Sequence, residues 1–309
     1  MRTLVTGGAG FIGSNLVDAL LAQGHEVAIV DDLSGGKEEN LRDALAAGAV
    51  LHRADVRDGE RMRELLAEVA PEVVFHLAAQ VDVRISLADP AADARTNVEA
   101  TVGLLEAARV AGVRRFVFAS TGGAMYGDTD VVPTPETVAP LPMSAYGQSK
   151  FCAERYLAFY ERAHGLSTVA LRFGNVYGPR QDPHGEAGVV AIFCGLLKAG
   201  RAPIVYGTGE QTRDYIYVDD VVAGLLAAAS SDVIGELNLG TEEETSVLTI
   251  VERLGALEPE VDFRPELRPA RAGELDRSCL DAERAREQLG WRATVAFADG
   301  LRRTYAATR

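Results

Sequence analysis

Short apolar runs alternate with amphipathic stretches through the first half of the chain. The apolar runs are continuous and rich in β-branched residues, which is typical of strands in a sheet that helices cover on both faces. The stretches between them repeat their apolar residues with the period of a helix. The predicted strands are Arg2–Thr6, Glu26–Val30, Val50–Ala54, Glu72–His76, Arg114–Ala119 and Thr168–Phe173, and the predicted helices include Phe11–Gln23, Gly59–Val69, Ala94–Ala111 and Ala145–His164.

This alternation predicts an α/β protein with a Rossmann-type, doubly wound parallel sheet. We assign residues 1–175 to this domain, together with a returning segment near residues 214–240. Prolines and glycines interrupt the rest of the chain. Residues 176–309 are therefore expected to form a smaller, mixed α/β lobe that covers the carboxyl edge of the sheet, where ligands of such folds bind.

Charge and composition exclude several classes of partner. The formal net charge is −14, which argues against nucleic acid because that binding depends on basic patches. No apolar run approaches the ~20 residues of a membrane-spanning helix. The three cysteines show neither metal-ligand nor disulfide spacing. Because the first residues lead directly into a strand without a signal peptide, we expect a cytoplasmic protein with no membrane and no metal site.

A glycine triplet, Gly7, Gly10 and Gly13, stands between the first predicted strand and the first predicted helix. Glycines at this spacing allow a tight turn and a close approach to a pyrophosphate, toward which the helix directs its N–H groups. Roughly 20 residues later, Asp31 ends the second strand. A carboxylate there accepts the ribose hydroxyls of NAD and repels the 2′-phosphate of NADP, so we predict NAD.

Other residues of the predicted cofactor site have ordinary alternatives. Asp55 follows the third strand and either bonds the adenine amino group or caps the next helix. Asp32 either assists Asp31 or is an exposed cap. The small residues after the fourth strand suit a loop close to the cofactor, or a plain strand exit. The additional cofactor positions are Phe11, Ile12, Asp32, Asp55, Val56, Leu77, Ala78 and Ala79.

Tyr146 and Lys150 lie four residues apart at the start of a predicted helix, which places both side chains on one face. A phenol is a poor base at neutral pH because its pKa is about 10. A nearby ammonium lowers that pKa, and the phenol can then take and return a hydroxyl proton. Ser120 and Thr121, after the fifth strand, are candidates to bond the reacting oxygen, or else they satisfy the local turn.

With these motifs in order along its whole length, the chain resembles the extended short-chain dehydrogenase/reductases. It is most similar to the NAD-dependent epimerase/dehydratase family and, within it, to the UDP-glucose 4-epimerases. The segments that carry the resemblance, besides the glycine triplet, Asp31 and the Tyr146/Lys150 pair, are Ser120–Gly127, Leu171–Arg180 and Arg213–Ile216.

The resemblance implies roles for individual residues and for both parts of the chain. Tyr146 would be the base, Lys150 would hold the nicotinamide ribose, and the small side chain of Ser278 would leave room for an N-acetyl group. Residues 1–175 would bind NAD and residues 176–309 the UDP-sugar, in a homodimer. The other implied positions are Asn97 on the preceding helix, Asn175 and the arginines Arg213 and Arg271 at the diphosphate, and Val189 at the uridine.

Two departures from the family pattern affect the predicted reaction. Gly122 stands where the family usually has Ser or Thr, so the part played by Thr121 is open. Gly123 and Ala124 stand where 4,6-dehydratases carry an Asp-Glu pair. The favoured hypothesis is a UDP-hexose 4-epimerase that works by transient C4 oxidation. The alternatives are a UDP-glucuronate 4-epimerase or decarboxylase, a 4,6-dehydratase, or a non-catalytic NAD-sensing protein.

Overall fold

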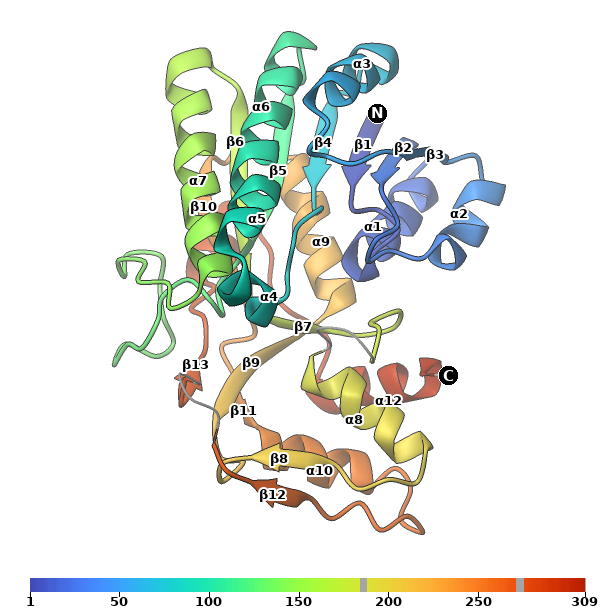
Figure 1. Cartoon of the computed structure of the whole chain (residues 1–309), viewed down its shortest axis with the longest axis vertical. Helices are drawn as coiled ribbons and strands as arrows, with labels where there is room; N and C mark the ends of the chain where they lie inside the picture. The colour runs from blue at the N-terminus through green and yellow to red at the C-terminus, as the bar shows by residue number, and fades with distance from the viewer. Residues whose placement is uncertain (184–187, 271–274, 309) are drawn as a thin grey trace.

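The computed structural model describes residues 1–183, 188–270 and 275–308 (Figure 1). Within these residues the main sheet has seven strands, all paired in parallel, in the order β10-β6-β5-β4-β1-β2-β3. The order reverses beside β1, and such a switch point is where open α/β sheets bind ligands. The strands are β1 (Arg2–Thr6), β2 (Glu26–Asp31), β3 (Val50–Arg53), β4 (Val73–His76), β5 (Arg115–Thr121), β6 (Ser167–Phe173) and β10 (Gly235–Leu239).

Helices cover both faces of this sheet, because neighbouring apolar residues of each strand point to opposite sides. Val5 packs in one core cluster with α1 (Phe11–Ala22) and α9 (Val218–Ala229). Leu4 packs in a second cluster with α3 (Gly59–Val69), α6 (Ala100–Val110) and α7 (Ala145–His164). In Figure 1, α6 and α7 lie in front of the sheet and α9 lies behind it. The predicted fold class is thus confirmed.

The helix expected over Ala94–Ala111 consists of three pieces. It begins as α5 (Pro90–Ala94), passes through a π-helical turn at Arg95–Glu99, and continues as α6. Asn97 lies in the π-helical turn. Such turns widen a helix by one residue and occur frequently at functional sites. The periodicity of the sequence carries no mark of this extra residue.

Most of the remaining elements form the lobe at the carboxyl ends of the strands (Figure 1). Its small sheet has the order β11-β9-β13, with β7 also paired to β9. The returning segment near 214–240 divides, since β9 lies in the small sheet while α9 and β10 join the main one. The further elements are β7 (Asn175–Tyr177), α8 (Val189–Lys198), β8 (Ile204–Tyr206), β9 (Thr212–Tyr217), β11 (Glu244–Ser246), α10 (Val247–Gly255), β12 (Glu266–Arg268), β13 (Arg277–Ser278), α11 (Glu283–Leu289) and α12 (Phe297–Ala307), with η1 (Glu38–Leu41), α2 (Arg42–Ala46) and α4 (Val83–Ala88) in the first half.

Candidate active site

The glycine triplet forms the turn between β1 and α1. Gly7 has a φ of +70°, and a Cβ there would lie 2.7 Å from the backbone nitrogen of Ala78. A Cβ on Gly13 would overlap the carbonyl oxygen of Gly7. Gly10 is the N-cap of α1 and provides no side-chain cap for the first turn, which contains Phe11 and Ile12. Uncapped N–H groups at a helix start suit a phosphate.

Asp31, at the end of β2, points its carboxylate at this turn. One oxygen accepts from the backbone nitrogen of Ala9 and the other from Leu33, both at 2.9 Å. Burial raises the pKa of Asp31. Asp32 instead bonds its own loop, accepting from the Ser34 nitrogen at 2.9 Å and hydroxyl at 2.6 Å. Asp31 is thus the carboxylate placed beside the phosphate turn, and its negative charge fits NAD in preference to NADP.

Asp55 lies between β3 and α3 and forms an ion pair with Arg57. The Nη2 atom of Arg57 lies 2.5 Å from the Asp55 carboxylate. This ion pair lowers the pKa of Asp55. The alternative in which Asp55 caps the next helix is wrong, because Asp58 caps α3 by accepting from the Arg61 nitrogen. Val56 is buried in the core.

The loop Leu77–Ala79 is tied to Asn97 through a buried histidine. The Thr101 hydroxyl donates to the Asn97 carbonyl at 2.9 Å, so it accepts from His76 Nε2 at 2.9 Å. His76 Nδ1 then accepts from the Thr6 hydroxyl at 2.7 Å. Thr6 itself accepts from the Ala78 nitrogen at 3.2 Å. Burial lowers the pKa of His76 to about 3, so the ring is neutral.

Tyr146 and Lys150 both lie on the first turns of α7, which Ser144 caps. Ala124 N–H donates to the Thr121 hydroxyl at 3.2 Å. Burial and the charge of Asp93 raise the pKa of Tyr146, and the smaller effect of the Thr121 hydroxyl lowers it.

Lys150 is buried and its ammonium is oriented by β5. Its Nζ donates to the Ala119 carbonyl at 2.8 Å and lies 4.5 Å from the centre of the Phe118 ring. The Tyr146 ring centre is 6.0 Å away. Burial lowers the pKa of Lys150 to about 8, against the charges of Asp93 and Glu154. The pKa of the phenol is therefore governed by burial, Asp93 and Thr121, whereas the spacing of Tyr146 and Lys150 predicts an effect of the ammonium alone.

Ser120 faces the opposite side of β5 from Thr121. Its hydroxyl donates to Glu154 Oε1 at 2.7 Å, and Glu154 forms a buried ion pair with Arg172 at 2.6 Å. Arg172 also donates to the Tyr126 hydroxyl, which in turn donates to Asn238 Oδ1 at 2.8 Å. Ser120 thus belongs to a buried polar network that joins β5, α7, β6 and β10, and Thr121 is the hydroxyl beside the phenol.

On the substrate side, the structure places Asn175 and Arg213 at the junction of sheet and lobe. Asn175 Oδ1 lies 3.3 Å from where a Cβ on Gly123 would stand. Ser278 pairs in register with Arg213, because β13 runs beside β9. Val189 begins α8 and is half-buried. Arg271 lies outside the described residues.

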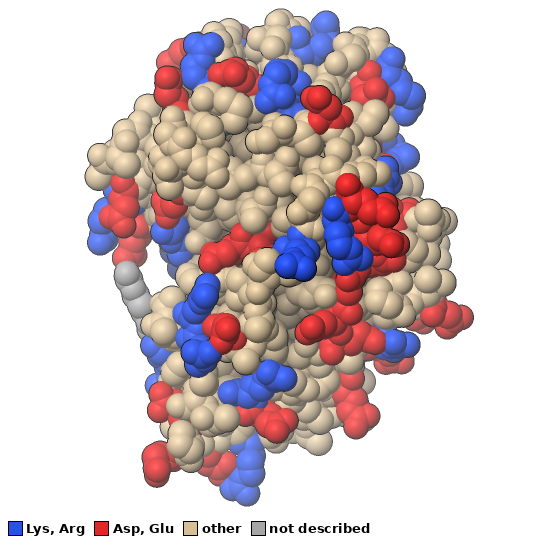
Figure 2. Space-filling model, turned by 180° about the vertical axis from the view of Figure 1, so that it is seen from behind, with Lys and Arg blue, Asp and Glu red and all other residues tan. Residues whose placement is uncertain are grey.

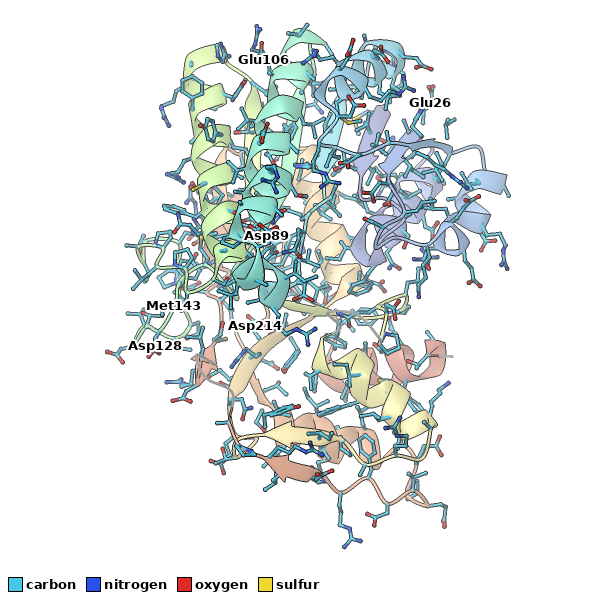
Figure 3. All side chains as sticks on the ribbon, viewed as in Figure 1. Glu26, Asp89, Glu106, Asp128, Met143 and Asp214 are labelled. Atoms are coloured by element: carbon cyan, nitrogen blue, oxygen red, sulfur yellow. The ribbon has the colours of Figure 1, made fainter. Side chains whose placement is uncertain are left out.

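Asp214, next to Arg213, anchors this junction (Figure 3). It is 1% exposed, and it accepts from the Thr241 nitrogen at 2.8 Å and the Leu280 nitrogen at 3.2 Å. Burial raises the pKa of Asp214. These bonds hold the strand that carries Ser278 against β9.

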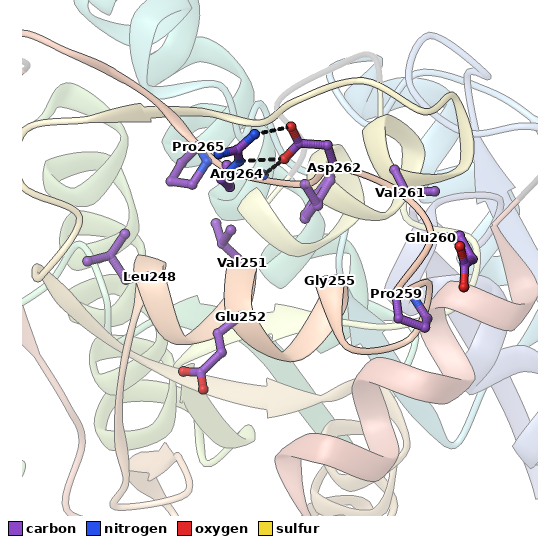
Figure 4. Close-up of a pocket in the computed structure, with 11 residues that line it drawn as sticks. Leu248, Val251, Glu252, Gly255, Pro259, Glu260, Val261, Asp262, Arg264 and Pro265 are labelled. Atoms are coloured by element: carbon purple, nitrogen blue, oxygen red, sulfur yellow. Dashed lines mark hydrogen bonds and ion pairs between the residues drawn. The ribbon is translucent and has the colours of Figure 1, made fainter.

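Outside this region, a hollow of about 670 Å³ lies between α10 and residues 259–265 (Figure 4). An ion pair between Arg264 and Asp262 closes part of its rim. Of the predicted site residues that the structure describes, none lines this hollow. We therefore place the site at the carboxyl edge of the main sheet.

Acidic and basic side chains are interspersed on the face shown in Figure 2. Among the described residues, no helix is long and apolar enough to cross a membrane. The described part of the chain also contains no cluster of three or more His, Cys, Asp or Glu that suits a metal ion.

Three buried groups near the Tyr146–Lys150 pair were not predicted from the sequence: His76, Asp93 and Glu154. Glu154 carried a readable signal, since it follows Lys150 by four residues on the same helix face. His76 ends a strand that was predicted, but its contacts come from distant residues. Asp93 resembles an ordinary acidic residue in the first turn of a helix.

Comparison with known proteins agrees with the geometry. The NAD dependent epimerase/dehydratase family matches residues 3–240. A UDP-glucose 4-epimerase of Mycolicibacterium smegmatis is 49% identical over 98% of this chain and 97% of its own. A UDP-glucose 4-epimerase of Thermotoga maritima, solved with UDP-glucose, has a TM-score of 0.96 at 45% identity, covering 99% and 98% of the two chains. The Thermus thermophilus UDP-glucose 4-epimerase, solved with NAD, has a TM-score of 0.92 at 42% identity, covering 100% and 99%.

Proposed function

This chain belongs to the NAD-dependent epimerase/dehydratase family, and we propose from its site that it is an NAD-dependent UDP-hexose 4-epimerase. The observation that carries this proposal is the Tyr146 phenol, which lies one helical turn from Lys150, with the Lys150 ammonium 6.0 Å from the centre of its ring. The pair lies at the carboxyl end of β5, because Lys150 donates to the Ala119 carbonyl, and β5 neighbours β4 at the switch point of the sheet. The relatives of this chain include enzymes that were solved with UDP-glucose and with NAD.

The residues present fit NAD. The turn at Gly7 leaves no room for a side chain, α1 starts without a side-chain cap, and Asp31 offers a carboxylate for ribose hydroxyls. Bound NAD supplies the acceptor for the C4 hydride. Lys150, with two donors beyond its bond to Ala119, would hold the nicotinamide ribose. Asn97 would keep the π-helical turn in place beside it.

Tyr146 would take the proton from the 4-hydroxyl of the sugar as the C4–H bond breaks, which leaves a 4-keto sugar. Thr121 would donate a hydrogen bond to the phenolate and hold it in position. Inversion requires that the 4-keto sugar present its other face before C4 regains its hydride and Tyr146 returns the proton to O4. Asn175, Arg213 and Arg271 would bind the diphosphate meanwhile, and Val189 would contact the uridine.

The alternative reactions have less support. A 4,6-dehydratase needs an acid and a base near C5 and C6, where this chain has Gly123 and Ala124. A UDP-glucuronate decarboxylase usually has a glutamate in the same segment, which this chain lacks. A non-catalytic NAD sensor has no need of Thr121 beside Tyr146.

The sugar range is proposed from Ser278. Ser278 pairs in register with Arg213, and its side chain is much smaller than that of a tyrosine. We therefore expect UDP-N-acetylglucosamine to be accepted with UDP-glucose. Ser278→Tyr should reduce the ratio of N-acetyl to plain epimerase activity, with Ser278→Ala as the control. An unchanged ratio would contradict this assignment.

We also propose a homodimer that forms through the adjacent helices α6 and α7 (Figure 1). Tyr156 and Phe159 on α7 are 43% and 45% exposed, which is unusual for large apolar side chains on one helix. A second copy of the same helix pair would cover them. Replacing both with aspartate should halve the mass measured by light scattering.

The three cysteines are free thiols, which fits the reducing cytoplasm.

The first experiment is to incubate the purified protein with UDP-glucose without added NAD and separate the products by chromatography. UDP-galactose would demonstrate epimerisation with retained cofactor. Tyr146→Phe keeps the ring and removes the acidic hydroxyl, so it should lower kcat by at least about 100-fold. No product from the wild type, with NAD present in the protein, would refute the proposed reaction.

A further inference from the structure

The loop that follows β4 is held at two points by side chains of other elements. Ala78 N–H donates to the Thr6 hydroxyl at 3.2 Å, at the end of β1. Gln80 N–H donates to Asn97 Oδ1 at 3.0 Å, and Asn97 Nδ2 donates to the Gln80 carbonyl at 2.9 Å. Asn97 lies in the π-helical turn. The loop is therefore fixed between the end of β1 and the π-helical turn.

His76 connects these two anchors to each other. Its side chain lies inside the protein, with 1% of the residue exposed. Nδ1 lies 2.7 Å from the Thr6 hydroxyl, and Nε2 lies 2.9 Å from the Thr101 hydroxyl. The Thr101 hydroxyl donates to the Asn97 carbonyl at 2.9 Å. The hydrogen bonds thus form a closed ring that includes the loop, and a buried polar network of this kind makes its members rigid.

The direction of each bond fixes the form of the histidine. Thr101 uses its single proton on Asn97, so it accepts from His76 Nε2–H. Nδ1 then carries no proton and accepts from the Thr6 hydroxyl. Burial, which lowers the pKa of His76 to about 3, agrees with a neutral ring. The Nε2–H tautomer is therefore the one that completes the ring.

The ring touches the turn between β1 and α1, where the glycine triplet lies. A Cβ on Gly7 would stand 2.7 Å from the backbone nitrogen of Ala78 and 2.9 Å from the carbonyl carbon of Leu77. Gly7 also follows Thr6 directly in the chain. Because the two backbones are in contact, a displacement of the loop would change the shape of the turn that receives the pyrophosphate.

We propose that His76 is a positioning residue for NAD, which acts through Thr6 and Thr101 to lock the loop after β4 between the glycine turn and the π-helical turn. The loop, the glycine turn and Asn97 then form one rigid wall of the cofactor site. The proposal deepens the cofactor site on which the proposed function rests, but NAD binding can be measured without epimerase activity.

The test compares three isosteric variants, Thr6→Val, Thr101→Val and Thr168→Val. The first two break the ring. Thr168 is the matched control, because it is buried on β6 and donates to the Leu157 carbonyl at 3.2 Å, outside the ring. Each variant loses one buried hydroxyl, so all three should have a lower Tm. The decisive quantity is the rate at which bound NAD exchanges with isotopically labelled NAD.

We expect NAD to exchange about tenfold faster from Thr6→Val and Thr101→Val than from the wild type, because each leaves a buried group of the ring without its partner. Thr168→Val should exchange NAD at the wild-type rate. The double variant Thr6→Val/Thr101→Val should exchange less fast than the two single effects multiplied, because both break the same ring. A residue that only supported the fold would change Tm and leave the exchange rate as it is.

NMR of protein labelled with ¹⁵N-histidine tests the ring directly. The chain has five histidines, and His76→Gln assigns the signals of His76. We expect a proton on Nε2 and none on Nδ1 at neutral pH. A proton on Nδ1, or equal exchange rates in Thr101→Val and Thr168→Val, would overturn the proposal. If Thr101→Val released NAD faster but the wild type gave no epimerisation, the proposed function would fail and the role of His76 would stand.

Discussion

Replacing Arg172 with methionine would leave the Glu154 carboxylate buried without its cation. The side chains of the two residues are 3% and 0% exposed. Arg172 Nε and Nη2 donate to the two carboxylate oxygens at 3.0 and 2.6 Å, and the ion pair raises the pKa of Arg172. Breaking a buried pair of this kind costs about 3–5 kcal/mol, because one charge remains in an apolar interior. We expect Arg172→Met to lower the free energy of unfolding by that amount.

The double variant Arg172→Met/Glu154→Leu separates the lost ion pair from the remaining charge. With both charged groups replaced by apolar side chains of similar volume, the desolvation cost disappears as well. The Ser120 hydroxyl loses its acceptor, which costs about 1–2 kcal/mol. The double variant should therefore be more stable than Arg172→Met, and its loss should be well below the sum of the two single losses.

Thermal unfolding is the assay, with each variant compared with the wild type at the same pH and protein concentration. In a chain of this size, 1 kcal/mol corresponds to about 2 °C, so Arg172→Met should lower Tm by about 5–10 °C. A neutral surface variant, Arg162→Met on the exposed side of α7, provides the control. If Arg172→Met lost less than about 1 kcal/mol, or if the single losses simply added, the reasoning from the buried charge would be refuted.

Three further predictions concern the site and its support. Gly13→Ala adds a methyl group that overlaps the Gly7 carbonyl, so the purified variant should release at least about tenfold less NAD on heating; equal release would contradict the close approach. Thr121→Val should lower kcat by about 10–100-fold with little change in KM, whereas Ser120→Ala should lower Tm and leave kcat within a few-fold; the reverse pattern would exchange their roles. The pKa of His76 is about 3 in the folded chain, below its unfolded value, so its stabilising contribution is complete above about pH 6.5 and falls by up to about 1.4 kcal/mol per pH unit toward pH 4. Urea unfolding from pH 7 to 4.5 should show a shallower loss for His76→Gln, and equal slopes would refute a neutral His76.

The main sheet was predictable because each strand carries its own signal. Strands such as β4, whose four residues are all buried, appear as continuous apolar runs. The edge strand β10 was harder, because Gly235 and Asn238 interrupt its apolar pattern. Asn238 is fully buried and donates to the Thr134 carbonyl at 2.9 Å. That contact satisfies the polar group, and no local pattern predicts it.

The choice between Ser120 and Thr121 shows why spacing alone could not identify the second hydroxyl. Successive residues of a strand point to opposite faces, so the hydroxyls of Ser120 and Thr121 cannot both reach the same side chain. The register of β5 and the positions of Glu154 and Tyr146 decide which is which. These contacts span more than 20 positions of the sequence, and Gly122 in the family's usual position added a second ambiguity.

The charges around Lys150 were the least predictable part of the site, and they change how its chemistry must work. A lysine four residues after a tyrosine predicts a phenol with a lowered pKa. In the folded chain, burial and Asp93 raise the pKa of Tyr146, and the opposing effect of Thr121 is smaller. The four-residue spacing shows that Lys150 lies on the same helix face as Tyr146, but it does not show how deeply the phenol is buried or that a carboxylate from another helix acts on it. The direction of this pKa therefore depends on contacts between distant parts of the chain.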